Sequence, residues 1–103
     1  MSEVVDLKNI SKFNGQNFQA WKFQMKAILI ANDILGIVDG TEPKPEQTDQ
    51  AAIKSWVRRD AKAMFILSSS MESAQLEYLI TCESSKDMWS KLSSIHEQRS
   101  ESN

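Results

Sequence analysis

Apolar residues between positions 17 and 32 recur every three or four residues, which is the spacing of an α-helix. At about 100° per residue they form two stripes on different sides of that helix. The first stripe contains Phe18, Trp21, Met25, Ile28 and Leu29, and the second contains Phe23, Ala27 and Ile30. Because a surface helix needs only one apolar stripe, we expect this helix to be covered on two sides.

Two arrangements would cover the second stripe. In one, the stripe lies in the core of a monomer, and in the other it contacts a second copy of the chain. Residues 1–12 place apolar side chains among charges, and we expect them to form a partly ordered arm. Because Leu7, Ile10 and Phe13 can lie against the second stripe, we favour covering by this arm.

A short helix and a loop are predicted next. Asp33 is expected to cap a helix over residues 34–38, and Gly40 is expected to end it in a left-handed conformation. Residues 41–47 contain both prolines of the chain, and proline does not continue a helix. This segment is therefore predicted to be an exposed, mostly acidic loop.

A long helix is predicted from its cap at Thr48 or Asp49 to about Ser69. Its first half is amphipathic, whereas the sequence AKAMFIL makes its second half apolar on nearly every side. We therefore expect a central helix whose second half is buried nearly all round. Its apolar residues at helical spacing are Ile53, Trp56, Val57, Met64 and Leu67, joined in the second half by Ala61, Phe65 and Ile66.

Two further helices complete the prediction. The first covers residues 73–81, and its buried side is expected to contain Leu76, Leu79 and Ile80. Ser84 and Asp87 form a capping-box-like pair at the start of the second. The buried stripe of this last helix is expected to contain Met88, Trp89, Leu92 and Ile95.

The predicted fold class is all-α, a compact bundle of about five helices, because no segment alternates with period two over a strand's length. At 103 residues the chain fits one domain, with an arm over 1–12, a helical domain over 13–97 and a tail over 98–103. That tail is expected to be disordered or to begin an inter-domain linker. The expected core anchors are Phe13, Phe18, Trp21, Met25, Trp56, Leu67, Trp89 and Leu92. Each tryptophan N–H is expected to reach a backbone carbonyl or water at the rim of the core.

Charged residues fall into blocks of opposite sign, although the net charge is only −2. Residues 33–52 are mainly acidic, whereas residues 1–32 and 53–70 are mainly basic. Such blocks are typical of solvated helix faces, and alternatively they favour head-to-tail contacts between neighbouring subunits. The candidate subunit contacts are Lys22, Lys26, Glu42, Glu46, Asp49, Arg58, Arg59 and Lys62.

The residue sets that catalysis and metal binding require are incomplete. Cys82 and His96 are the only cysteine and the only histidine, so neither a catalytic pair nor a zinc site is predicted. We expect His96 on the surface and Cys82 in the core or at its boundary. The three glycines do not form a phosphate-binding pattern. The sequence therefore predicts no enzymatic activity, no cofactor and no small-molecule substrate.

Short motifs follow one another in a defined order along residues 7–99. The first are Phe13-Asn14-Gly15-x-Asn17-Phe18-x-x-Trp21-Lys22, Met25, Leu29, Leu35 and Val38-Asp39-Gly40 before a proline-containing loop. The later ones are Trp56, Asp60-x-x-Ala63, Ile66-Leu67 and Ser84-x-x-x-Met88-Trp89-x-x-Leu92. Taken together, their order and spacing resemble the N-terminal region of Gag polyproteins from copia-type LTR retrotransposons.

The resemblance implies a capsid-type domain similar to the N-terminal half of retroviral capsid proteins, which assembles shells around the element's RNA. It implies contacts with the chain itself or with other Gag subunits, in virus-like particles in the cytoplasm, with the nucleus as the alternative location. A second capsid domain and a zinc knuckle follow in that family, and the 103 residues here do not contain them. We therefore expect either an excised N-terminal domain or a truncated, host-retained fragment.

Two alternative functions remain open. A truncated, domesticated Gag fragment would co-assemble with intact Gag and inhibit it. Alternatively, a weak association with RNA would use the cations Lys22, Lys26, Arg58, Arg59 and Lys62 and would depend steeply on salt. No membrane association is predicted, because no apolar run is long enough to span a bilayer and the first residues do not resemble a secretory signal.

Overall fold

Residue 7 and residues 10–97 are described by the structure, a computed structural model of the 103-residue chain. The helices are α1 (Phe18–Ala31), α2 (Leu35–Asp39), α3 (Gln50–Ser69), α4 (Ser73–Leu76), the 3-10 helix η1 (Glu77–Leu79) and α5 (Ser85–His96). The described residues contain no strand, so the predicted all-α fold is confirmed. Most of the predicted arm and the whole predicted tail, residues 98–103, lie outside the described residues.

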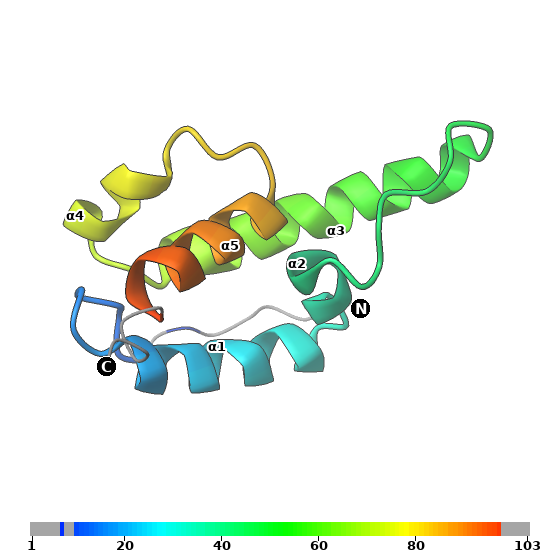
Figure 1. Cartoon of the computed structure of the whole chain (residues 1–103). Helices are drawn as coiled ribbons and strands as arrows, with labels where there is room; N and C mark the ends of the chain where they lie inside the picture. Colours follow the sequence, from blue (N-terminus) through cyan, green and yellow to red (C-terminus); the bar gives the residue numbers. More distant parts are fainter. Residues whose placement is uncertain (1–6, 8–9, 98–103) are drawn as a thin grey trace.

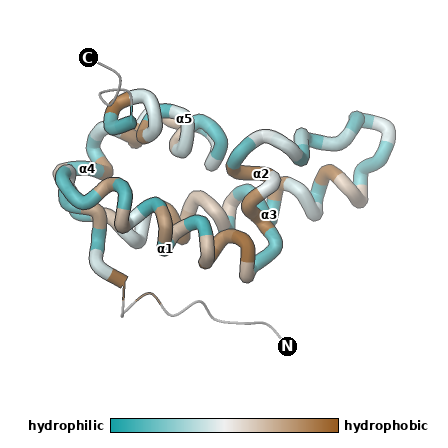
Figure 2. Tube along the Cα trace, turned by 60° about the horizontal axis from the view of Figure 1, so that its bottom comes forward, coloured by the Kyte–Doolittle hydropathy of each residue, from teal (hydrophilic) through white to brown (hydrophobic). Residues whose placement is uncertain are grey.

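The core lies between α1 on one side and the pair formed by α3 and α5 on the other (Figure 1). α2 packs against both α3 and α5. α3 is the longest helix, with 20 residues, and its N-terminal part extends beyond the other helices together with the loop before it (Figure 1). Figure 2 shows mainly hydrophilic residues in that loop. The buried residues of α3 all lie in its C-terminal part, from Asp60 to Leu67.

Trp21 lies in the centre of the core and is only 1% exposed. Its indole N–H donates to the Ser70 carbonyl oxygen at 3.0 Å. The backbone N–H of Phe13 donates to the same carbonyl at 2.9 Å, and the N–H of Glu72 donates to the Phe13 carbonyl at 3.0 Å. The Phe13 and Phe18 rings pack against Trp21 with centroid separations of 5.3 and 5.9 Å. The segment before α1 is thus tied to the end of α3.

Three helix ends have the caps that the sequence predicts. Gly40 ends α2 with a φ of +88°. At the start of α3, the Asp49 carboxylate accepts a hydrogen bond from the Ala52 N–H at 3.0 Å. At the start of α5, the Ser84 hydroxyl accepts one from the Asp87 N–H at 3.1 Å. These ends are set locally, because each cap uses groups within a few residues of itself.

The prediction that Asp33 caps α2 is wrong. Asp33 has a φ of +60°, and its N–H donates to the Ile30 carbonyl at 2.9 Å. The next N–H, from Ile34, donates to the Leu29 carbonyl at 2.9 Å. This pair of bonds is a Schellman motif, which ends a helix. Asp33 therefore ends α1, because aspartate tolerates the left-handed conformation that the motif requires.

Most of the expected core anchors are fully buried. The tryptophans of α3 and α5 are the exceptions, since Trp56 and Trp89 are only half-buried. Trp89 packs against the core, with its ring centroid 6.2 Å from that of Trp21. Trp56 lies away from the central core, and its indole N–H donates to the Glu42 carbonyl at 3.0 Å. The buried anchors are Phe13, Phe18, Trp21, Met25, Leu67 and Leu92.

The expectation that the second half of α3 is buried nearly all round is wrong. Ala63, Ile66 and Leu67 are buried, but Phe65 is 66% exposed and Ala61 is also exposed. The reason is that the other helices cover α3 on one side only (Figure 1). The predicted short helix over residues 73–81 likewise divides into α4 and η1, and its Ile80 is 68% exposed rather than buried.

The expected covering of the second α1 stripe by the arm is also wrong. Phe23 is 77% exposed and Ile30 is 60% exposed. Phe13, which was expected against them, packs in the core on the opposite side of α1, and the half-buried Leu7 also packs against the core. The first stripe is covered as predicted, so one side of α1 faces the core and the other faces solvent.

A buried polar contact joins α3 to α5. The carboxylate of Asp60 is in the core region, with the residue only 8% exposed. It accepts hydrogen bonds from the backbone N–H of Ser85 at 3.0 Å and from the Ser85 hydroxyl at 2.6 Å. Ser85 is the first residue of α5, where backbone N–H groups lack partners within the helix. Asp60 therefore supplies from α3 an acceptor that α5 needs.

Candidate interaction surfaces

The residues predicted as subunit contacts do not form one surface. Lys22 and Lys26 lie on α1, whereas Arg58, Arg59 and Lys62 lie on α3. The acidic members, Glu42, Glu46 and Asp49, lie in the loop between α2 and α3. Glu46 and Asp49 are exposed, as are Lys26, Arg58 and Lys62.

Arg59 and Glu42 form a bidentate ion pair within the chain. Arg59 Nη1 lies 2.6 Å from Glu42 Oε2, and Nη2 lies 2.9 Å from Oε1. Nη2 also donates to the Asp33 carbonyl oxygen at 2.6 Å. The hydrogen bond from Arg59 lowers the pKa of Glu42, and the same bond raises the pKa of Arg59. Together with the bond from Trp56, this pair holds the loop after α2 onto α3.

Replacing Glu42 by glutamine is expected to destabilise the fold in a pH-dependent way. The folded-state pKa of Glu42 lies below its ordinary value of 4.5. The ion pair therefore stabilises the fold fully above pH 4.5, and this stabilisation is lost as the pH falls through the folded-state pKa. The Glu42 side chain is 45% exposed, so the loss at neutral pH should be under about 1 kcal/mol. Urea unfolding of both chains at neutral pH and well below pH 4 measures this, and an equal difference at both would contradict it.

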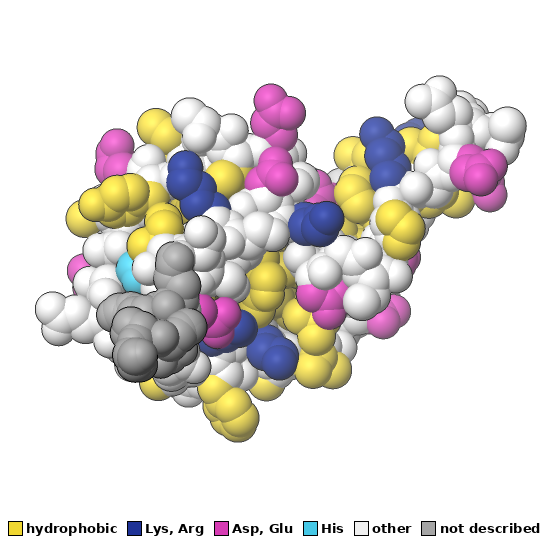
Figure 3. All heavy atoms as spheres, viewed as in Figure 1, with side chains coloured by type: hydrophobic (Ala, Val, Ile, Leu, Met, Phe, Trp, Pro, Cys, Tyr) yellow, Lys and Arg dark blue, Asp and Glu magenta, His cyan; other side chains and the backbone are white. Residues whose placement is uncertain are grey.

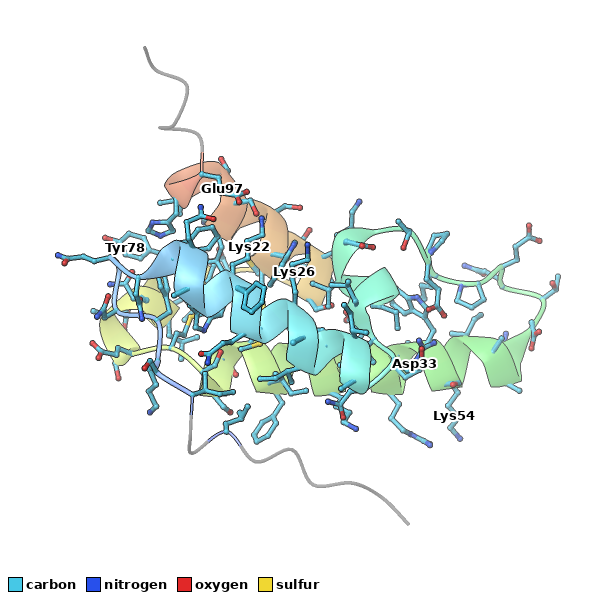
Figure 4. All side chains as sticks on the ribbon, turned by 90° about the horizontal axis from the view of Figure 1, so that it is seen from below. Lys22, Lys26, Asp33, Lys54, Tyr78 and Glu97 are labelled. Atoms are coloured by element: carbon cyan, nitrogen blue, oxygen red, sulfur yellow. The ribbon has the colours of Figure 1, made fainter. Side chains whose placement is uncertain are left out.

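Lys22 joins α1 to the end of α5. Its ammonium pairs with the Glu97 carboxylate and lies 5.8 Å from the ring centroids of Phe18 and Trp89. Figure 4 shows Lys22 directed toward Glu97, with Lys26 one turn further along α1. Lys22 is therefore already engaged within the chain, whereas Lys26 is exposed beside a shallow groove lined also by Phe23.

The α1 outer face consists of Phe23, Lys26, Ala27 and Ile30. All four residues are exposed, and they lie opposite the buried stripe that contains Trp21. Hydrophobic side chains protrude at the lower edge of the molecule, where α1 lies (Figure 3). The sequence predicted this apolar stripe, but it did not reveal that the stripe is left uncovered.

The α3 outer face consists of Lys54, Val57, Arg58, Ala61, Lys62 and Phe65, and all six residues are exposed. At about 100° per residue they occupy one side of α3, opposite Ala63 and Ile66. Sequence reasoning identified Arg58 and Lys62 but placed Val57 and Phe65 in the core. The signal that could have separated them is the spacing, because Phe65 lies seven residues after Arg58 and shares its side of the helix.

His96 and Cys82 have structural surroundings. The His96 ring stacks on Phe18 at 5.3 Å and meets the edge of Phe13 at 4.8 Å, so it is half-buried rather than on the open surface as predicted. Cys82 lies at the boundary of the core, as predicted, and burial raises the pKa of its thiol. Among the described residues, no three histidine, cysteine or acidic side chains come together to hold a metal ion.

These features define a helical domain whose distinctive surfaces are outward helix faces that carry apolar side chains. In the part of the chain that the structure describes, none of the helices has the length and apolar character needed to cross a membrane. The family model described as the gag-polypeptide of LTR copia-type matches residues 25–103, and the chain belongs to this family. The resemblance found in the sequence is thereby confirmed. No solved structure matches the chain, so similarity to the retroviral capsid domain stays a prediction.

Proposed function

We propose that the chain is a structural subunit that contacts other Gag copies in a capsid-like particle, with the cytoplasm as its place of assembly. Membership of the copia-type Gag family supports a structural role of this kind. The observation that carries the proposal is the α1 outer face, on which Phe23 is 77% exposed and Ile30 is 60% exposed.

Single exposed apolar residues are common on protein surfaces, but apolar residues grouped along one face often mark a contact site. Phe23, Ala27 and Ile30 follow one another at helical spacing and are grouped in this way. Burying a phenylalanine or isoleucine side chain fully stabilises an association by about 1.5–3 kcal/mol. A contact of this size is weak for one pair of molecules and becomes effective when many copies are held together.

Replacing both Phe23 and Ile30 by serine is expected to reduce self-association of the chain. Both positions are exposed, so the substitutions remove contact area without opening a cavity in the core. Sedimentation velocity and light scattering over a range of concentrations should show the average mass rising for the wild-type chain and much less for the double variant.

A matched control is Gln24→Ser, which changes an exposed residue of the same helix and removes no apolar side chain. Circular dichroism establishes that all three chains keep the same helical fold. If the double variant associated as strongly as the wild-type chain and the control, the α1 outer face would not be a subunit contact.

A further inference from the structure

The α3 outer face combines positive charge with apolar surface. Lys54, Arg58 and Lys62 follow at intervals of four residues, and Val57 and Phe65 lie beside them with 47% and 66% exposure. Among the described residues, the ion pairs are Lys22 with Glu97 and Arg59 with Glu42. These three cations of α3 therefore have no acidic partner within the part of the chain that the structure describes. The face is suited to a partner that is acidic and apolar.

A surface of that character lies on the same chain. The acidic segment, residues 72–83, contains α4, η1 and the turn that follows, and it has no lysine or arginine. Its acidic residues Glu72, Glu77 and Glu83 are exposed. Two apolar residues lie between Glu77 and Glu83 in the sequence and are also exposed, Tyr78 at 60% and Ile80 at 68%. Figure 3 shows hydrophobic and acidic side chains together at the end of the molecule where α4 lies.

The two surfaces include residues at opposite ends of the molecule. Lys54 lies near the N-terminal end of α3, on the side of α3 that faces away from Glu97 (Figure 4). Tyr78 lies at the other end of the molecule (Figure 4). Contact between two molecules can bring the complementary charges at these two ends together.

We propose that the α3 outer face of one copy docks against the acidic segment of a second copy. This inference rests on the proposed function and names two of the surfaces that the subunits would use. The contact joins two different surfaces, so after pairing one copy retains an unused acidic segment and the other retains an unused α3 outer face. Such head-to-tail contacts produce closed rings or open arrays, which a shell requires, rather than isolated two-fold dimers.

The two kinds of side chain have different roles in this contact. The opposite charges orient the two copies and speed their encounter, and salt weakens that effect. The apolar side chains, with Phe65 on one surface and Ile80 on the other, provide the area that is removed from water. A contact built in this way is specific in its orientation and remains weak for a single pair.

A second copy is a better fit to the α3 outer face than RNA. Nucleic-acid sites rely on many lysine and arginine contacts to phosphates, and the chain as a whole has a net charge of −2. Two of the five cations considered for RNA binding, Lys22 and Arg59, are engaged in ion pairs within the chain. The remaining cations of α3 alternate with apolar residues, which phosphate groups do not need.

The decisive experiment reverses the charges of each surface separately. One variant carries Arg58→Glu and Lys62→Glu, and the other carries Glu77→Lys and Glu83→Lys. Every substituted position is exposed, so both chains should keep their fold, which circular dichroism verifies. Sedimentation velocity at low salt should show that each variant alone associates at least about tenfold more weakly than the wild-type chain, because like charges then face each other.

An equimolar mixture of the two variants should associate again. In that mixture, the reversed, acidic α3 face of the first variant meets the reversed, basic segment 72–83 of the second. The unchanged basic α3 face of the second variant meets the unchanged acidic segment of the first. A control chain with Lys12→Glu and Lys44→Glu has the same net charge as the first variant but changes exposed residues outside both surfaces. It should associate like the wild-type chain, which separates a local contact from a general effect of charge.

The outcomes distinguish this inference from the proposed function. One outcome is that both variants associate as strongly as the wild-type chain, and another is that the mixture of the two variants does not regain association. Either outcome refutes the docking of these two surfaces, while association of the wild-type chain leaves the proposed function standing. If the wild-type chain stays monomeric at every concentration, both are refuted.

Fluorescence anisotropy with a labelled RNA oligonucleotide provides the last arm. Salt-sensitive RNA binding that Arg58→Glu and Lys62→Glu abolish, with self-association unchanged, would assign the α3 outer face to RNA instead.

Discussion

Replacing Trp21 by alanine is expected to lower the free energy of unfolding by about 3–5 kcal/mol. Trp21 is 1% exposed and contacts aromatic rings from three parts of the chain, so its removal leaves a cavity that rigid neighbours fill poorly. Its indole N–H also binds the end of α3 through the Ser70 carbonyl. Because small domains have a total stability of only about 5–15 kcal/mol, this one change removes a large share of it.

Trp21→Phe separates the two contributions of the indole. It retains an aromatic ring and loses the N–H donor, while the Ser70 carbonyl still accepts a bond from the Phe13 N–H. Its loss should therefore be smaller, about 1–2 kcal/mol. Urea unfolding followed by far-UV circular dichroism measures both variants. An unfolding midpoint of Trp21→Ala equal to that of the wild-type chain would show that this residue is not a core anchor.

Replacing Asp60 by alanine is expected to destabilise the fold by about 2–4 kcal/mol. The substitution leaves the N–H and hydroxyl of Ser85 without their acceptor in a region where water is largely excluded. It also removes a negative charge from the N-terminal end of α5, where the helix dipole favours one. The loss should appear as a lower urea midpoint and as weaker attachment of α5 to α3.

A double-mutant cycle with Ser85→Ala tests this directly. If Asp60 acts through Ser85, the double variant should be less destabilised than the sum of the two single variants, because each single change already breaks the hydroxyl bond. Asp60→Asn retains an acceptor oxygen and should lose less than Asp60→Ala. Additive losses in the cycle would mean that Asp60 stabilises the chain through contacts other than the Ser85 hydroxyl, such as the Ser85 backbone N–H.

The parts of the fold that were predicted correctly depend on neighbours in the sequence. Gly40, Asp49 and Ser84 end or begin their helices as expected, because each satisfies backbone groups a few positions away. The buried stripe of α1 follows from helical spacing for the same reason. Asp33 was misread because an N-cap favours aspartate, whereas a Schellman motif only tolerates it, and the backbone path between α1 and α2 decides which of the two forms.

The candidate surfaces were predicted less well than the helices. Helical spacing placed Phe23 and Ile30 together on one stripe of α1, in agreement with the structure. It also placed Arg58 and Lys62 together on one side of α3, which the structure bears out. Phe65 was assigned to the core because it lies in an apolar run, although its seven-residue spacing from Arg58 places it on the same side of α3 as that arginine. Arg59 differs, because its pairing with Glu42 depends on how the loop after α2 returns to α3.

By itself, the sequence determined that this chain is helical, where most helices begin and end, and which family it belongs to. Those properties depend on local hydrogen bonding and on the order of motifs. Only the tertiary structure decided that Asp60 binds the start of α5, that Trp56 holds a loop rather than the central core, and that Phe23 and Phe65 face solvent. The physical reason is that burial depends on which other helix lies over a given side, and several packings of the same helices would satisfy the same local pattern.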